Sequence, residues 1–323
     1  MGTFDNTRGA NAYQAKIFCG YNSSMSSITR FGCETARKSS VTIGGLRLNF
    51  LEWGRAGRPG LCFLHGGSAH AHWFDLVTPA FADRFHVIAL DQRGHGESQW
   101  AKPAAYATED FAADLLGVID ALGWHRVALV GHSMGGHNAM SFSAWHPERV
   151  SALAIVDSRP SIPVERLARL RRRGERTLRP YPTLEAAARS FRLLPRETMA
   201  DPAFLAHLGA AGVVERAGQW FYRFDPASNT GRQPVDAWLL LDRITAPTLI
   251  TRGALSPVLP RDMADKLRAA IRGAVLAEIP ESYHHLVLDN PAGFVQTLDA
   301  FLARVFDAGR SPTPGRPPSG AGR

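Results

Sequence analysis

The chain has little cysteine and no long apolar run. Three cysteines among 323 residues (Cys19, Cys33 and Cys62) are too few for a disulfide framework, and their spacing fits no zinc site. No stretch approaches the roughly 18–20 consecutive apolar residues that a membrane-spanning helix needs. We therefore expect a protein of a reducing compartment, the cytoplasm, without a membrane span.

A nucleic-acid-binding motif is also lacking, although the net charge is +8. Much of the excess positive charge lies in residues 159–179 and in the C-terminal tail. Charge without a recognition motif is more typical of a solvated basic face. We therefore predict a small-molecule substrate and no nucleic-acid partner.

Short apolar runs and helical patterns alternate through most of the chain. Runs of this kind are typical of strands that are buried on both faces of a parallel sheet. The sequence therefore predicts an α/β fold with a mostly parallel central sheet and helices on both faces. Strands are expected at 41–43, 46–53, 61–64, 86–90, 127–130, 150–156, 247–251 and 275–279, and helices at 71–81, 108–122, 134–145, 260–271 and 291–306.

The alternation stops between residues 159 and 236. This segment, which we call the cap, is rich in Arg and Ala, and prolines divide it into helical pieces. The predicted organisation is a core of residues 41–158 and 237–306 with an inserted helical cap. Residues 1–40 are expected to form a disordered leader, or a segment for organelle targeting, and residues 307–323 a disordered tail.

One pentapeptide carries a clear chemical signal. Gly131-His132-Ser133-Met134-Gly135 follows an apolar strand and precedes a helical pattern. This strand–turn–helix setting presents a serine on a strained turn, and small neighbours are needed because the backbone packs tightly there. The pattern therefore predicts Ser133 as a nucleophile.

A nucleophilic serine needs a base and an oxyanion hole. The candidate base is His284, in a loop just past the last predicted strand, with adjacent His285 as the alternative. The two histidines could instead bind a metal, but no accompanying carboxylate–histidine spacing supports this, and we expect no metal. The oxyanion donors are expected to be the backbone N–H groups of Met134 and Gly67.

These motifs resemble those of the α/β-hydrolase fold superfamily. The resemblance rests on His65-Gly66-Gly67, the run Asp91–Ser98, the pentapeptide around Ser133, and His284 through Pro291, in this order across residues 41–306. The chain is similar to the epoxide-hydrolase-like and meta-cleavage-product-hydrolase-like branch, which carries a helical cap. The resemblance implies a structural role for the Asp91–Ser98 loop, with Asp91 and Arg93 as a supporting pair.

The acid of the triad departs from the commonest pattern of this superfamily. The resemblance implies an Asp a few residues after Gly253, where this chain has Ala254-Leu255-Ser256-Pro257. Some members carry the acid after the strand that follows the nucleophile helix, and here that strand ends in Asp157. We therefore expect Asp157 to orient the histidine. Asp262 and Asp242 remain alternatives.

The predicted function is that of a cofactor-free serine hydrolase acting on a carboxylic ester, a lactone or a similar carbonyl compound. The aspartate nucleophile of epoxide hydrolases and haloalkane dehalogenases is disfavoured because this chain has Ser133. Carbon–carbon bond hydrolysis on the same triad is the first alternative. A ligand-binding receptor on a hydrolase scaffold is the second, since fold does not fix function.

Substrate choice is expected to depend on the cap. Trp73, His132 and Trp220 are candidates for the substrate pocket. Arginines recur between Arg166 and Arg176 at mixed helical spacings. One of them could bind a carboxylate, but a solvated helix face is the more ordinary interpretation.

Overall fold

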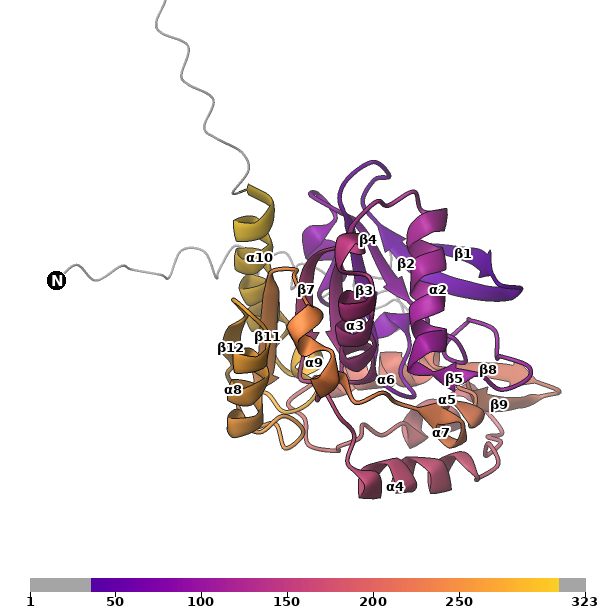
Figure 1. The fold of residues 1–323 in the computed structure, drawn as a ribbon. Helices are drawn as coiled ribbons and strands as arrows, with labels where there is room; N and C mark the ends of the chain where they lie inside the picture. Colours follow the sequence, from indigo (N-terminus) through magenta and orange to yellow (C-terminus); the bar gives the residue numbers. More distant parts are fainter. Residues whose placement is uncertain (1–35, 308–323) are drawn as a thin grey trace, which may run out of the picture.

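A mixed sheet of eight strands forms the centre of the computed structural model, which describes residues 36–307 (Figure 1). The spatial order of the strands is β1-β2-β4-β3-β6-β7-β11-β12. Their bounds are β1 Arg37–Ile43, β2 Leu46–Trp53, β3 Gly60–Leu64, β4 His86–Leu90, β6 Val127–His132, β7 Val150–Val156, β11 Thr248–Gly253 and β12 Val275–Ile279.

The sheet is parallel from β4 to β12, whereas β2 runs antiparallel to both of its neighbours. The carboxyl ends of the parallel strands therefore meet at one edge. At this edge Gly131 pairs with Leu64 on one side and with Ile155 on the other. The loops after β3, β6 and β7 consequently start close together.

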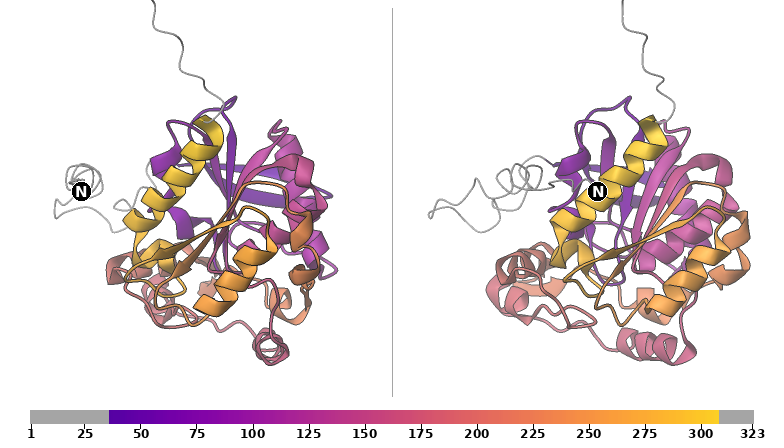
Figure 2. Two further views of the ribbon diagram at one scale, coloured as in Figure 1. Left: turned by 60° about the vertical axis from the view of Figure 1, so that its left-hand side comes forward. Right: turned by 90° about the vertical axis from the view of Figure 1, so that its left-hand side faces the viewer.

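Side chains alternate between two hydrophobic clusters, one on each face of the sheet. In β6, Leu129 belongs to the cluster that includes α2 (Thr108–Ala121), α3 (Met134–Trp145) and α8 (Arg261–Ala270). Val130 belongs to the other cluster, which is covered by α10 (Pro291–Asp307) and by the 3-10 helices η3 (Ala71–Phe74) and η4 (Thr78–Phe81). This alternation is the period of two expected for a strand that is buried on both faces. The two views of Figure 2 show α10 lying across the sheet.

The inserted segment lies beside the sheet, with α4 farthest from it in Figure 1. It is not purely helical, because β8 and β9 form an antiparallel hairpin around Ala217 and Gly218, both at positive φ. The last strand of the inserted segment, β10, pairs with β5 (Tyr106–Ala107) of the core. The elements of the insertion are α4 Val164–Gly174, α5 Leu184–Ser190, α6 Pro202–Ala211, β8 Val213–Arg216, β9 Gln219–Tyr222, α7 Ala227–Thr230 and β10 Arg232–Gln233.

Several boundaries differ from the prediction. The first strand begins at Arg37, inside the predicted leader 1–40, because it pairs with β2 along its whole length and Arg37 makes an ion pair with Glu52. The prediction places the start of the tail (307–323) one residue too early, because Asp307 is still part of α10. The remainder of the leader and of the tail, with Cys19 and Cys33, lies outside the described residues.

The predicted helix over residues 71–81 is instead two short 3-10 helices, η3 and η4. Pro79 has no backbone N–H and so cannot donate to the Asp75 carbonyl oxygen, as a continuous α-helix through both segments would require. The short helix α9 (Leu286–Asp289), directly after His284 and His285, was not predicted.

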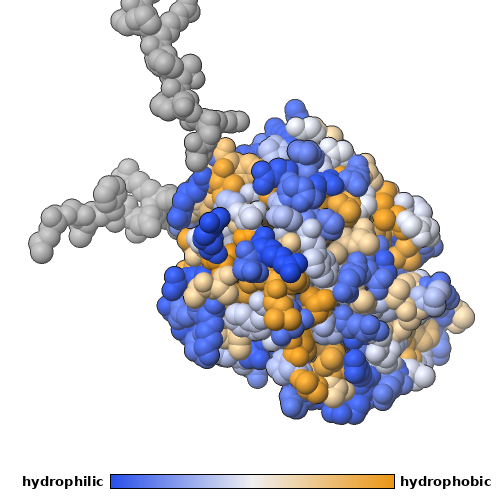
Figure 3. Space-filling view, in the orientation of Figure 1, coloured by the Kyte–Doolittle hydropathy of each residue, from blue (hydrophilic) through white to orange (hydrophobic). Residues whose placement is uncertain are grey.

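The surface in Figure 3 is mainly hydrophilic, with separate hydrophobic patches. Within residues 36–307, no helix has the length and apolar character needed to cross a bilayer.

Leu129 tests how strongly the strand that leads to Ser133 depends on its packing. Its side chain is 1% exposed, whereas Leu239 in η6 (Ala237–Leu239) is 74% exposed. We expect Leu129→Ala to lower the free energy of unfolding by about 2–5 kcal/mol, through lost burial and a new cavity. Leu239→Ala should change it by no more than about 0.5 kcal/mol in the same urea titration. Equal effects of the two changes would contradict the packing described here.

Candidate active site

Ser133 lies on a sharp turn between β6 and α3. Its backbone has φ 53° and ψ −114°, a region that L-residues rarely adopt. The neighbouring glycines permit the turn: a Cβ on Gly131 would lie 2.3 Å from the Gly135 carbonyl oxygen, and a Cβ on Gly135 would lie 2.1 Å from that of Leu64. The small neighbours expected from the sequence are therefore a steric requirement.

A hydrogen-bonded chain joins the three residues of the predicted triad. The Ser133 Oγ lies 3.1 Å from His284 Nε2. On the other side of the ring, His284 Nδ1 lies 2.7 Å from Asp157 Oδ2. An Nδ1–H that donates to the carboxylate leaves Nε2 free to accept the serine proton, which is the arrangement that a serine nucleophile requires.

Asp157 follows β7 and is completely buried. Its Oδ2 also accepts a hydrogen bond of 2.6 Å from the Ser256 hydroxyl, and its Oδ1 accepts one of 3.2 Å from the Gly253 N–H. Ser256 thus occupies the segment in which the resemblance implied an Asp, and it binds the carboxylate that the preceding strand supplies. The alternatives Asp262, in α8, and Asp242, in η7 (Leu241–Arg243), are both exposed.

Burial and local charge set the protonation of these groups. Burial lowers the pKa of His284, and the positive charge of Arg166 lowers it further. The imidazole is therefore neutral at neutral pH and able to act as a base. Burial raises the pKa of Asp157, while the hydrogen bond from Ser256 acts in the opposite direction.

His285, the alternative base, points elsewhere. Its Nε2 donates to the Pro195 carbonyl oxygen at 3.1 Å, and its ring packs edge-on against Trp73 with centroids 5.8 Å apart. No hydrogen bond joins it to Ser133 or Asp157 in the described part of the chain. The structure therefore brings His284, and not His285, to the serine.

Within residues 36–307, two groups of side chains have donor atoms close enough to hold a metal ion. In the first, formed by His132, His284 and His285, both nitrogens of His284 are already engaged with Asp157 and Ser133. In the second, His72 Nδ1 and His207 Nε2 lie 2.9 and 2.8 Å from Asp75 Oδ2. This second group links α6 of the insertion to η3 of the core by hydrogen bonds.

The expected oxyanion donors flank Ser133. Met134 is the first residue of α3, a position whose N–H has no acceptor within the helix. The Gly67 N–H has no acceptor among the described residues. Gly66 packs closely against the nucleophile, since a Cβ at that residue would lie 3.2 Å from the Ser133 Cβ. Two N–H groups are thus available where an oxyanion would form.

Ser133, Met134 and Gly67 lie in a cavity of about 710 Å³ between the sheet and the insertion. Tyr181, Tyr222 and other residues of the insertion supply much of its wall. The cavity therefore places the predicted nucleophile and oxyanion donors beside the predicted cap.

The structure does not place the three predicted pocket residues in the lining of this cavity. Trp73 is only 5% exposed and packs behind Phe191, which does line the cavity. His132 lies beneath the ring of His284 and hydrogen-bonds to the His284 carbonyl oxygen through Nε2 at 2.9 Å. Trp220 pairs with Tyr181 through the backbone, and Tyr222 of the same strand lines the wall instead.

The expected pair of Asp91 and Arg93 is wrong. The Asp91 carboxylate accepts the backbone N–H groups of Ala71 and Glu97 at 2.7 and 2.9 Å, and so holds the turn around it. Arg93 binds Asp114 of α2 instead, through two hydrogen bonds of 2.6 and 2.8 Å. A structural role for the loop remains consistent with these contacts.

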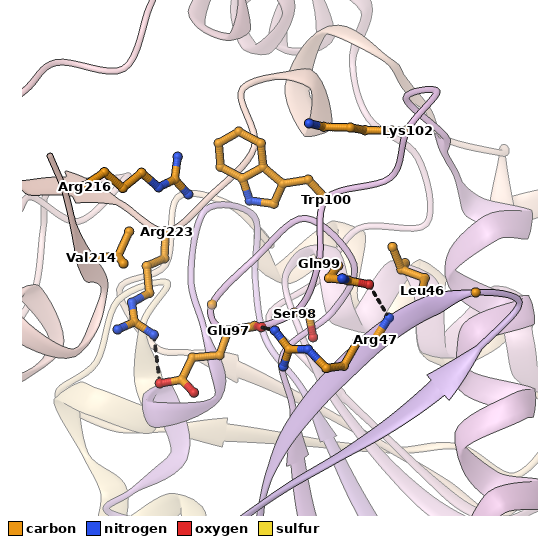
Figure 4. Close-up of a pocket in the computed structure, with 12 residues that line it drawn as sticks. Leu46, Arg47, Glu97, Ser98, Gln99, Trp100, Lys102, Val214, Arg216 and Arg223 are labelled. Atoms are coloured by element: carbon orange, nitrogen blue, oxygen red, sulfur yellow. Dashed lines mark hydrogen bonds and ion pairs between the residues drawn. The ribbon is translucent and has the colours of Figure 1, made fainter.

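A second cavity, of about 880 Å³, has none of the three triad residues in its lining (Figure 4). It is bounded by the Glu97–Trp100 segment and by Arg216 and Arg223 of the insertion. Glu97 binds Arg223 at 2.8 Å, and the Arg216 guanidinium lies 5.0 Å from the centre of the Trp100 ring. These contacts join the hairpin of the insertion to the core.

Sequence reasoning missed two residues of the site. Ser256 gave no signal beyond its place where an Asp was expected. Arg232 lies in the two-residue strand β10, and its guanidinium approaches Gly67: Nη1 is 3.6 Å from the point that a Gly67 Cβ would occupy. No local pattern could have connected a residue in so short a strand with the nucleophile.

Comparison with known proteins gives relatives that are hydrolases. The chain is 37% identical over 134 residues to the 2-(acetamidomethylene)succinate hydrolase of Mesorhizobium japonicum, a match that covers 41% of this chain and about half, 47%, of the relative. It is 28% identical over 267 residues to an esterase of Mycobacterium tuberculosis, which covers 79% of this chain and 86% of the relative.

Solved structures agree with these matches. The crystal structure of E-2-(acetamidomethylene)succinate hydrolase superposes with a TM-score of 0.74 at 25% identity, covering 83% of this chain and 99% of that one. The family model of the alpha/beta hydrolase fold matches residues 59–291. The resemblance inferred from the motifs is thereby confirmed, and the chain belongs to the α/β-hydrolase fold family.

Proposed function

We propose that this protein is a serine hydrolase that transfers an acyl group from a carboxylic ester, a lactone or a similar carbonyl substrate to water. The observation that carries the proposal is the hydrogen-bonded chain from Ser133 through His284 to Asp157, which opens into a cavity. A nucleophile, a neutral base, an orienting acid and two free N–H donors in one place are the requirements of acyl transfer.

In the proposed first step, Ser133 Oγ attacks the substrate carbonyl carbon while His284 Nε2 takes the hydroxyl proton. The N–H groups of Gly67 and Met134 hold the oxyanion of the tetrahedral intermediate. His284 then gives its proton to the leaving group, and an acyl-enzyme remains on Ser133. In the second step His284 activates a water molecule, whose attack releases the acid and restores the serine.

Carbon–carbon bond hydrolysis remains a second candidate on the same residues. The positive charges of Arg166 and Arg232 in the cavity favour it, because such substrates need groups that bind an acid near the scissile bond. Parallel assays with simple esters and with acidic diketones would separate the two reactions.

Reaction with a fluorophosphonate tests the nucleophile without a known substrate. The probe needs an activated serine, so intact mass should show one adduct on the wild-type protein and none on Ser133→Ala. Ser143→Ala is a suitable control, because the Ser143 hydroxyl is buried in α3 away from the base. An adduct that persists in Ser133→Ala, or none on the wild-type protein when small fluorophosphonates are used, would contradict the proposed nucleophile.

The Asp157→Asn variant tests the acid. An amide can hold the ring in the wrong tautomer and cannot stabilise an imidazolium, so we expect kcat for an activated ester to fall about 10⁴-fold. Asp262→Asn changes an exposed carboxylate on α8 and should leave kcat within about twofold of wild type. Circular dichroism of both variants establishes that the fold is retained. Near-normal turnover of Asp157→Asn would refute its role.

The pH dependence of labelling tests the environment of the base. Labelling needs neutral His284 and is lost as the pH falls through the pKa of this residue, which burial and Arg166 lower from the usual 6.5. The rate should therefore hold from neutral pH to well below 6.5. Arg166→Gln removes a positive charge, so the pKa of His284 should rise and the acid limb should move to higher pH. Arg172→Gln, on the exposed side of α4, should not move it.

A further inference from the structure

The cavity that holds Ser133 is strongly positive. Among the described residues that line it, Asp157 is the one acidic residue, and it is already bound to His284 and Ser256. Eight arginines of the same described lining face this one acid: Arg159, Arg166, Arg173, Arg176, Arg179, Arg192, Arg196 and Arg232. The positive charge of the cavity is therefore not balanced by the described residues that line it.

Arg232 is the most unusual of these arginines. It is 7% exposed, yet its guanidinium makes no hydrogen bond or ion pair with any residue between 36 and 307. Two comparable arginines among the described residues have partners: the half-buried Arg93 binds Asp114, and the buried Arg252 binds Glu278 and the Leu259 carbonyl oxygen. A buried charge without a partner is destabilising, so the Arg232 guanidinium lacks a compensating anion among the described residues.

Arg232 remains charged although its surroundings oppose the charge. Burial and the charge of Arg166 lower its pKa to about 10, which still leaves the guanidinium protonated at neutral pH. Arg166, in α4, also has no hydrogen bond or ion pair with the described residues, and it lines the same cavity. The two guanidinium groups thus form a pair of cations in the lining of one cavity, one from β10 and one from α4, without an anionic partner among the described residues.

The position of Arg232 sets where the anion binds. Its Nη1 lies 3.6 Å from the point that a Gly67 Cβ would occupy, and the Met134 Sδ lies 3.9 Å from the same point. Gly67 and Met134 are the residues whose N–H groups we assign to the oxyanion. A negative group held by Arg232 therefore lies only a few bonds from the reacting carbonyl.

We propose that the substrate is an organic acid derivative whose carboxylate binds Arg232 beside the reacting carbonyl, with Arg166 as the second cation of the same subsite. A planar carboxylate matches the two parallel N–H donors of one guanidinium. This inference rests on the proposed hydrolase function and adds the chemical class of the substrate: a short dicarboxylic acid in which one carboxyl group is present as an ester, a lactone or a similar acyl derivative.

Of the remaining six arginines, Arg159 is half-buried and donates to the Val258 carbonyl oxygen. The other five are exposed: Arg173, Arg176, Arg179, Arg192 and Arg196. Cations around an opening raise the local concentration of anions and speed their entry, an effect that salt screens. They would attract the substrate, whereas Arg232 and Arg166 would fix its orientation.

Binding to the Ser133→Ala protein tests the subsite separately from catalysis. We expect calorimetric titration with succinate or glutarate at low ionic strength to give one site per chain, and the neutral diamide succinamide to give none. Arg232→Met in the same background should weaken dicarboxylate binding at least tenfold, whereas Arg172→Met, outside the cavity, should leave it unchanged. Binding that is indifferent to Arg232, or equal for the diamide, would overturn the proposal.

Inorganic phosphate provides a further arm of the titration. Phosphate that binds through Arg232 while succinate and glutarate do not would overturn the assignment of a carboxylate. Because these titrations need no nucleophile, dicarboxylate binding without any fluorophosphonate adduct would refute the hydrolase and retain the subsite. Fluorophosphonate labelling without dicarboxylate binding would retain the hydrolase and refute the subsite.

Thermal unfolding distinguishes ligand binding from a structural role. Because the Arg232 side chain has no hydrogen-bond or ion-pair partner within residues 36–307, Arg232→Met should leave Tm unchanged or raise it in the absence of ligand. Dicarboxylate should raise Tm only in proteins that keep Arg232. Arg232→Lys keeps the charge but not the paired donors, so its affinity for dicarboxylate should lie between that of the protein with Arg232 and that of Arg232→Met. A marked fall in Tm for both variants would show a structural role instead.

A matched pair of substrates extends the test to turnover. The 4-nitrophenyl hemiester of glutaric acid and 4-nitrophenyl pentanoate have acyl chains of the same length, with and without a carboxylate. Wild-type kcat/KM should favour the acid at least tenfold, and in Arg232→Met the ratio of the two kcat/KM values should fall to near unity. A wild-type preference for the neutral ester would contradict the proposed substrate class.

Discussion

The Asp157 carboxylate is the contact on which the rest of the site depends. It follows the end of β7 and binds side chains or backbone from two other segments: residues 253–256 at the end of β11, and His284 after β12. Three neighbouring strand ends are thereby fixed to one buried group. The cost of burying this charge is offset by hydrogen bonds from all sides, and the orientation of the imidazole follows from them.

Much of the fold could be predicted because its signals are local. β4, β12 and α3 begin and end where the sequence places them, since each is a short apolar run or a helical pattern with clear flanks. The β8–β9 hairpin was missed because its strands are only four residues each and partly exposed, so that neither shows a clear alternation. Its formation depends on the turn at Ala217-Gly218 and on contacts with Tyr181.

The same distinction between local signals and distant contacts holds for the residues of the site. Ser133 and His284 belong to motifs that reveal their position, and Asp157 follows a strand whose end the sequence marks. Ser256 and Arg232 act through contacts between distant segments, and a hydroxyl or a guanidinium in a loop or a very short strand has no characteristic spacing. The arginines of α4 were predicted as a solvated face. The structure divides them, since Arg166 and Arg173 line the cavity while Arg172 does not.

The pairing of β10 with β5 has a consequence for how such a protein could change. It attaches the end of the insertion to the core beside the nucleophile, and Tyr106 of β5 reinforces the junction through a hydrogen bond of 2.5 Å to Asp225. Arg232 thus lies in a part of the cavity wall that is anchored to the core. The helix α4 reaches the cavity from a separate stretch with many exposed side chains. Evolution could therefore replace α4 and alter which molecules are accepted, while Arg232 kept its position relative to the nucleophile.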